Sequence, residues 1–193
     1  RIGGDPLVRD AMVARKDSGI KTLADMKGKK LGFADPDSTS GYLVPVTALP
    51  KDIKTSVKDY FSETGFGGGH ENLVLAVKDG KFDAGTTFGS GVGKFDEGYT
   101  SGNLRKMVDK GIIDMKDFVE LWKSPLIPNG PIVVRTSLDS DMKTKYKNFM
   151  MELPKSDPAC FAATMGGDFK GYTEVNTEFY QPIIDARKAQ IGG

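Results

Sequence analysis

The chain has 193 residues, and its 27 Lys and Arg against 26 Asp and Glu leave a formal net charge of +1. This balance argues against the concentrated basic face that nucleic-acid or membrane-surface binding needs, and no run approaches the ~20 apolar residues of a membrane-spanning helix. The single cysteine, Cys160, cannot form an internal disulfide, and one cysteine with one distant histidine cannot build a usual zinc site, so we expect no metal and no cofactor.

The first half of the chain alternates strands with helices. Asp10–Arg15 and Leu31–Ala34 are predicted as strands, and Tyr42–Leu49 as a helix closed by Pro50. A glycine-rich loop then leads into a second helix over Glu71–Asp79, and a strand follows over Lys81–Phe88. This order is typical of an α/β unit with a mostly parallel sheet, in which ligands bind at the carboxyl ends of the strands.

Two turns of this unit can reach one cleft. Ser38, Thr39 and Ser40 open the first helix, where hydroxyl oxygens cap the chain and free N–H groups favour an anion. On this segment alone, a capped helix without a ligand is the simpler interpretation. The second turn, residues 65–69, holds four glycines that allow unusual backbone angles and leads to His70 at the start of the second helix.

The last third of the chain no longer alternates strands with helices. Three prolines within residues 125–131 argue against regular helix or central strand there, and Ile132–Arg135 is predicted as a strand directly afterwards. Helical patterns follow over residues 142–153, 158–165 and 177–189. Cys160, within an apolar run, is expected to be a buried small hydrophobe.

Three strings carry a resemblance to a known family. They are DPDSTSGYLVP (Asp35–Pro45), GGHENLVLAVKDGKFDAG (Gly68–Gly85) and WKSPLIPNGPIVVR (Trp122–Arg135), in this order and at this spacing. They closely resemble the phosphate/phosphite/phosphonate substrate-binding proteins of ABC transporters, the phosphonate-binding branch of the type 2 periplasmic binding proteins. The resemblance extends over most of the chain, from near Met12 to the final helix.

The resemblance implies an α/β fold of two lobes joined by crossing strands. Residues 1–29 and 132–193 would belong to lobe 1 with the crossing strands, and residues 30–131 would form lobe 2. Asp10–Arg15 would be the first crossing and Ile132–Arg135 the return. Members of the family normally carry a further segment before the position of Arg1, so we expect the first lobe to be incomplete in this chain.

The family's ligand contacts transfer to particular positions. Ser38, Thr39 and Ser40 match its hydroxyl triplet, and His70 matches its ligand-contacting histidine, which could donate as imidazolium or as neutral imidazole. Tyr42 is a further candidate for the wall of the cleft, as is Phe88, although core packing would also explain both aromatic residues.

Two positions depart from the aminoalkylphosphonate binders. By alignment, Ser90 and Gly130 stand where those proteins use two acids to receive the ligand ammonium. A buried ammonium without carboxylate partners is costly. We therefore expect Ser90 to face a smaller or uncharged-tail anion (phosphite, methylphosphonate, phosphate or a related oxyanion) and 2-aminoethylphosphonate not to be preferred.

The expected function is that of the solute-binding component of an ABC importer, which is not an enzyme. It would lie in the periplasm or be lipid-anchored on the outer face of the cytoplasmic membrane, and would deliver a phosphonate, phosphite or phosphate-like anion to a membrane permease. A sensory ligand-binding domain for a small anion is one alternative. A serine hydrolase using Ser38 or Ser40 with His70 is another, against which the chain shows no Gly-x-Ser-x-Gly elbow and no evident third acid.

Overall fold

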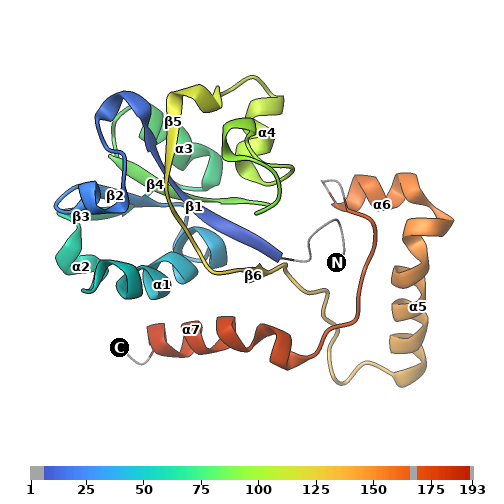
Figure 1. Cartoon of the computed structure of the whole chain (residues 1–193). Coiled ribbons are helices and arrows are strands. Elements are labelled where there is room, and N and C mark those ends of the chain that lie inside the picture. Colours follow the sequence, from blue (N-terminus) through green and yellow to red (C-terminus); the bar gives the residue numbers. More distant parts are fainter. Residues whose placement is uncertain (1–6, 166–168, 192–193) are drawn as a thin grey trace.

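The computed structural model describes residues 7–165 and 169–191 of the chain (Figure 1). β1 (Leu7–Arg15) runs through the sheet with Asp10–Ala14 buried, so the strand predicted from Asp10 is confirmed and begins three residues earlier. It pairs antiparallel with β4 (Ala84–Gly89) on one side and with β5 (Phe118–Lys123) on the other.

The other half of the sheet is parallel. β2 (Lys30–Phe33) lies between β3 (Glu63–Phe66) and β4 and is parallel to both. The strand order is β3-β2-β4-β1-β5, and the short β6 (Ile127–Pro128) pairs with the start of β1. The predicted parallel arrangement is therefore right for β2, β3 and β4, whereas β1 and β5 pair antiparallel.

Helices cover both faces of the sheet (Figure 1). α1 (Val44–Ile53) and α2 (Val57–Tyr60) pack on the face that carries Met12, whereas α3 (His70–Lys78) and α4 (Asn103–Asp109) pack on the face that carries Val13. Met12 and Val13 are both fully buried because successive strand residues point to opposite faces. The core therefore has two layers, one on each side of β1.

Glycines let α3 approach the sheet closely. Gly32 and Gly85 are partners on neighbouring strands, and a Cβ on Gly32 would lie 2.4 Å from Cδ1 of Leu73. A Cβ on Gly85 would lie 2.9 Å from Cγ of the same leucine. This packing holds His70, the first residue of α3, at the carboxyl end of β2.

Two local predictions in this half are wrong. Pro50 does not close the helix, because α1 continues to Ile53 and ends at Lys54 in the left-handed conformation with φ 59°. Buried Leu49 and the packing of Ile53 on the core stabilise the extra turn despite the missing N–H. The glycine-rich loop is also shorter than predicted, because Gly65 and Phe66 pair with β2 as the end of β3.

The C-terminal third is helical, as predicted. Its elements are α5 (Ser140–Ser156), α6 (Pro158–Met165), a 3-10 turn (Thr177–Tyr180) and α7 (Gln181–Ile191), which contacts α1. α5 and α6 lie away from the sheet, and α7 runs back beneath α1 (Figure 1).

Two predictions in this third are wrong. Ile132–Arg135 forms no strand and is exposed, because β-branched residues favour a strand only when a neighbouring strand pairs with them. Cys160 is exposed, because α6 packs against α5 through Phe161 and the adjacent position faces away.

Asp10 is a fully buried carboxylic acid in β1. Neither of its carboxyl oxygens has a hydrogen-bond partner among the residues that the structure describes. Burial raises the pKa of this carboxyl well above its ordinary value of 3.8. The folded chain therefore keeps a proton that the unfolded chain releases, and the free energy of unfolding falls as the pH rises above 3.8.

Asp10→Asn removes this ionisation and is expected to stabilise the fold at pH 7. The free energy of unfolding at pH 7 should rise, because the carboxyl must either keep a proton that the unfolded chain releases or be buried as a charge, and asparagine does neither. Urea unfolding at pH 7 and at pH 4 measures it, and the gain should shrink at the lower pH. Asp96→Asn, at an exposed position, is the control. Equal stability of wild type and Asp10→Asn at pH 7 would contradict the prediction.

Candidate functional site

The helical segment after β2 begins with the predicted hydroxyl residues. Ser38 is its N-cap, with extended backbone, and its Oγ accepts a hydrogen bond of 2.9 Å from the Gly41 N–H. Thr39–Leu43 form a wide π-helical turn that continues directly into α1. The bond of 3.0 Å from the Leu43 N–H to the Ser38 carbonyl closes this turn.

Thr39 and Ser40 carry the donors that this turn leaves unused. At a helix start, the first N–H groups have no acceptor within the helix. Neither the N–H groups nor the hydroxyls of Thr39 and Ser40 donate to any residue in the described part of the chain. Both residues are half-buried. Four donors without a partner among the described residues therefore lie on two adjacent residues at the positive end of a helix.

The turn is fixed to the carboxyl end of β2 and to the middle of β4. The Gly41 carbonyl accepts a bond of 3.0 Å from the Ala34 N–H and one of 2.9 Å from the Thr86 hydroxyl. The Gly69 N–H donates to the Ala34 carbonyl at 2.7 Å and places the start of α3 beside the turn. The structure thus brings the two predicted turns together at the edge of the sheet where ligands of α/β proteins bind.

His70 lies next to Ser38. Its Nε2 is 3.2 Å from the Ser38 Oγ, its Nδ1 is 3.3 Å from the Thr87 Oγ1, and the ring packs edge-on against Phe88. Burial lowers the pKa of His70 to about 4, against a weaker opposing effect of the Asp35 charge. Of the two predicted forms, the structure favours the neutral imidazole at pH 7.

The other two predicted residues lie differently. The Tyr42 ring packs edge-on against Phe33 and Phe66, so its ring belongs to the core on the α1 side. Ser90 is buried, and its Oγ donates to the Val92 carbonyl at 2.8 Å and lies 2.9 Å from the Thr100 Oγ1. The hydroxyl of Ser90 therefore forms its hydrogen bonds within its own loop. A ligand contact of Tyr42 or of Ser90 stays a prediction.

The sequence did not predict three buried polar residues near the site: Thr86, Thr87 and Asn103. The two threonines are fully buried, and Asn103 is nearly so. Two adjacent threonines inside an otherwise apolar strand were the available signal, because buried hydroxyls need hydrogen-bond partners. The partners come from the Gly41 turn, from α3 and from α4, so the sequence alone does not reveal them.

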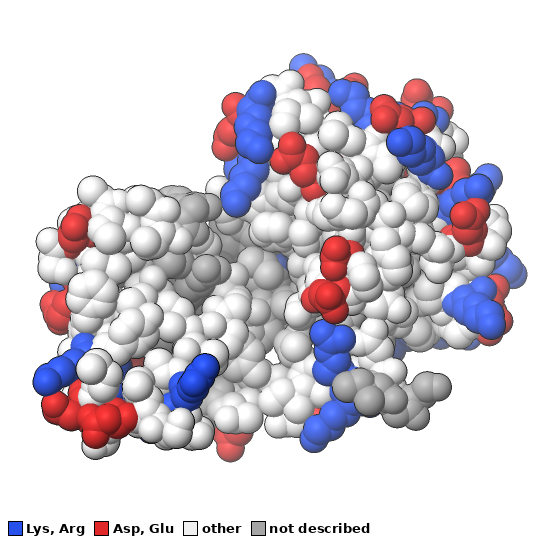
Figure 2. All heavy atoms as spheres, turned by 180° about the vertical axis from the view of Figure 1, so that it is seen from behind, with Lys and Arg blue, Asp and Glu red and all other residues white. Residues whose placement is uncertain are grey.

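Charge on the surface is mixed. Figure 2 shows acidic and basic side chains interspersed over one face, with a hollow between two masses of the molecule. Across residues 7–165 and 169–191, no cluster of three or more His, Cys, Asp and Glu is placed to hold a metal ion. Within the same residues, no helix combines the length and apolar character that a membrane crossing requires.

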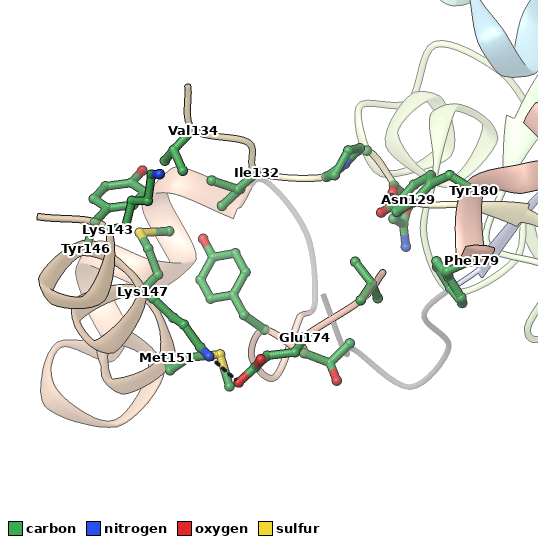
Figure 3. A pocket seen from close by; sticks show the side chains of 16 residues that line it. Asn129, Ile132, Val134, Lys143, Tyr146, Lys147, Met151, Glu174, Phe179 and Tyr180 are labelled. Carbon is green, nitrogen blue, oxygen red and sulfur yellow. Dashed lines mark hydrogen bonds and ion pairs between the residues drawn. The ribbon is translucent and has the colours of Figure 1, made fainter. Parts of the chain in front are cut away.

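A cavity of about 300 Å³ lies away from these residues, in the C-terminal third (Figure 3). It lies between α5 and the segments around Ile132 and Glu174, and much of its wall is apolar or aromatic. Lys147 forms an ion pair of 2.7 Å with Glu174, and Lys143 donates to the Thr136 carbonyl. Because both lysines have partners and none of the predicted contacts lines it, we do not assign the anion to this cavity.

Comparison with known proteins points to one family. The family model described as "ABC transporter, phosphonate, periplasmic substrate-binding protein" matches residues 1–180. The phosphonates-binding periplasmic protein of Escherichia coli K12 is 33% identical over 157 residues, which are 79% of this chain and 42% of the relative. The phosphate-import protein PhnD of Mycolicibacterium smegmatis is 31% identical over 156 residues, 78% and 45% respectively. The chain therefore spans about half the length of these curated relatives.

Solved structures agree on the fold. The binding protein component of an ABC phosphonate transporter from Pseudomonas aeruginosa superposes with a TM-score of 0.72 at 26% identity, over 96% of this chain and 59% of the other. PhnD1 from Prochlorococcus marinus, solved in complex with methylphosphonate, gives a TM-score of 0.70 at 16% identity, over 96% and 68%.

Proposed function

Because the chain belongs to the family of phosphonate periplasmic substrate-binding proteins of ABC transporters, we propose that it binds a phosphorus oxyanion as the solute-binding component of an importer. Its fold is the α/β fold of the type 2 periplasmic binding proteins. The observation that supports the proposal most directly is the set of four donors on Thr39 and Ser40 that have no partner in the part of the chain that the structure describes. A tetrahedral oxyanion presents several acceptor oxygens to such a helix start.

The geometry gives no support to a serine hydrolase. Ser38 lies near His70, as a nucleophile would, but the other ring nitrogen of His70 faces the hydroxyl of Thr87 rather than a carboxylate. The acid that orients and stabilises an imidazolium in a catalytic triad is thus replaced by a neutral group. The family is also one of substrate-binding transport proteins.

The proposed ligand is a small phosphorus oxyanion: phosphite, methylphosphonate or phosphate. Ser90 uses its hydroxyl within its own loop, and Gly130 has no side chain, so neither position supplies a carboxylate to a ligand ammonium. An unpaired ammonium would be costly to bury. We therefore infer that 2-aminoethylphosphonate binds more weakly than methylphosphonate.

The proposed partner is an ABC permease, and the proposed location is outside the cytoplasmic membrane, in the periplasm or on a lipid anchor. The names of the family and of the Escherichia coli relative support the extracytoplasmic location. A sensory domain would bind the same anion, and a neighbouring gene for a kinase rather than a permease would favour that alternative.

We also propose the division into lobes. Residues 30–131 would form lobe 2, and residues 1–29 and 132–193 would contribute to lobe 1 and the crossings. The exposed apolar side chains of Ile132, Tyr146 and Phe149 support this division, because the rest of a larger lobe would cover them. β1 lies in the same sheet as β2 and β4, so the first crossing would also serve as a sheet strand.

An NMR titration tests the ligand. Phosphite, methylphosphonate and phosphate are expected to shift the amide signals of Thr39 and Ser40, while Gly171, in the C-terminal third, stays unchanged. 2-Aminoethylphosphonate should require a higher concentration for the same shifts. If no phosphorus oxyanion moved these signals, the segment would be a capped helix only, and the proposed function would fail.

Thr39→Val tests one donor. The variant keeps the shape of the side chain but loses its hydroxyl, and should weaken phosphite binding by about 1–3 kcal/mol, the range for one hydrogen bond to a charged group or a group left unpaired. Calorimetry measures the loss. Thr144→Val is the matched control, because its hydroxyl donates to the Ser140 carbonyl within α5. Equal affinities of Thr39→Val and wild type would remove Thr39 from the site.

A further inference from the structure

We propose that Thr87 and Asn103 act as positioning residues that hold the proton of His70 on Nε2, so that the Ser38 hydroxyl donates its hydrogen to the bound oxyanion. The inference rests on the proposed function for its ligand, but its first step concerns the free protein. It adds two buried positioning residues behind the predicted contacts and specifies what Ser38 contributes. It also gives His70 a role through Ser38, in place of the direct ligand contact that the family resemblance implies.

A continuous row of polar contacts joins these residues. The Asn103 amide nitrogen donates to the Thr87 Oγ1 at 3.0 Å, and that oxygen lies 3.3 Å from the Nδ1 of His70. On the other side of the ring, Nε2 lies 3.2 Å from the Ser38 Oγ. Thr87 is fully buried and Asn103 is 6% exposed, so water has little access to their end of the row.

The direction of each hydrogen bond in the row follows from Asn103, at its buried end. An amide nitrogen can only donate, so the Thr87 oxygen is the acceptor from Asn103. The hydroxyl hydrogen of Thr87 is then free to be donated to Nδ1, which acts as the acceptor. The other ring nitrogen of a neutral imidazole carries the proton, so Nε2–H donates to the Ser38 Oγ.

Ser38 completes the row. Its oxygen accepts from the His70 Nε2–H and from the Gly41 N–H, which occupies both lone pairs. The hydroxyl hydrogen remains, and no residue in the described part of the chain accepts it. It adjoins the unused donors of Thr39 and Ser40. A bound oxyanion would therefore receive a fifth hydrogen bond, from Ser38.

The opposite tautomer would be unfavourable at one end of the row and would take the Ser38 hydrogen away from the ligand at the other. With the proton on Nδ1, the Thr87 oxygen would accept twice, and its own hydrogen would have no acceptor among the described residues. An unsatisfied buried donor is unfavourable. At the other end, the Ser38 hydroxyl would donate its hydrogen to Nε2, so this hydrogen would not be available to the ligand. The donation from Asn103 thus selects the tautomer that leaves Ser38 available.

The first measurement is the ¹⁵N NMR spectrum of the imidazole at pH 7 without ligand. The chain has one histidine, so the ring signals need no assignment among several. We expect the chemical shifts of the Nε2–H tautomer. The Nδ1–H tautomer in the wild-type protein would overturn the inference, whether or not phosphite binds.

The second measurement links the tautomer to the ligand. Thr87→Val keeps a β-branched side chain in β4 but removes the hydroxyl, and is expected to give a mixture of tautomers and about tenfold weaker phosphite binding. Thr87→Ser should restore both the tautomer and the affinity. Thr47→Val is the control, because that hydroxyl bonds only to carbonyls of its own helical segment.

The outcomes separate the two proposals. If the Nε2–H tautomer is found and no phosphorus oxyanion binds, the proposed function fails and the ligand role of Ser38 fails with it, while the proton assignment stands. If Thr87→Val changes the tautomer but leaves phosphite affinity unchanged, the Ser38 hydrogen does not reach the ligand. That result would overturn the inference while leaving the proposed function intact.

Discussion

Gly41→Ala is expected to reduce phosphite affinity by more than about a hundredfold and to lower the free energy of unfolding by about 1–3 kcal/mol. A Cβ at this position would lie 2.4 Å from the Ala34 Cβ, 2.7 Å from the His70 Cε1 and 3.1 Å from the Ser38 Oγ. The Ala34 Cβ is bonded directly to the backbone that follows β2, and it cannot give way as the end of a long side chain could. The turn must therefore move away from β2 and from His70.

The displacement would affect several bonds together. The Gly41 carbonyl holds the turn to Ala34 and Thr86, and its N–H holds the Ser38 side chain. A shift that relieves the clash would therefore misalign the donors on Thr39 and Ser40 that the anion needs. This is why one methyl group should cost more affinity here than the loss of a single hydroxyl.

Calorimetry with phosphite and urea unfolding measure the two effects. Gly171→Ala is the matched control, because its added Cβ would meet only the Pro154 Cγ at an ordinary contact distance of 3.7 Å. Wild-type affinity in Gly41→Ala would contradict the site, because it would mean that the close contact of this turn with β2 and His70 is not needed for binding.

The second large effect is a loss of folding stability at acidic pH. Burial lowers the pKa of His70 from 6.5 to about 4, so the unfolded chain takes up a proton in this range before the folded chain does. The stability that the buried neutral ring contributes is fully present above pH 6.5 and is lost as the pH falls towards 4. The loss should reach up to about 3 kcal/mol, because each pKa unit corresponds to about 1.4 kcal/mol.

Urea unfolding at intervals between pH 7 and pH 4 measures this loss, and His70→Gln should remove it. Asp10 has the opposite dependence, because its raised pKa adds relative stability as the pH falls. The comparison is therefore made in the Asp10→Asn background, where His70 contributes without that opposing effect. If His70→Gln leaves the slope between pH 6.5 and pH 4 unchanged, the ring is not a buried neutral group.

What could be predicted from the sequence is what local chemistry determines. A strand followed by Ser38, Thr39 and Ser40 predicts a capped helix start, because the cap and the helix are within a few residues of each other. The glycines before His70 likewise predict a turn into a helix, and the three family strings indicate the fold class and the anion. The order of strands and helices up to Phe88 places both turns at the carboxyl end of a sheet.

Only the tertiary structure decided the features that depend on partners far away in the sequence, namely strand pairing, burial and long-range hydrogen bonds. Ile132–Arg135 has the composition of a strand, but no strand of residues 7–165 and 169–191 pairs with it, and Cys160 lies in an apolar run but on the outward side of α6. Thr87 forms hydrogen bonds with residues of α3 and α4, and neither contact leaves a local pattern. The sequence alone therefore determined which donors could meet an anion. The packing of α3 and α4 on the sheet decided how His70 is buried and which donors its neighbours leave free, because burial and hydrogen-bond partners exist only once distant segments meet.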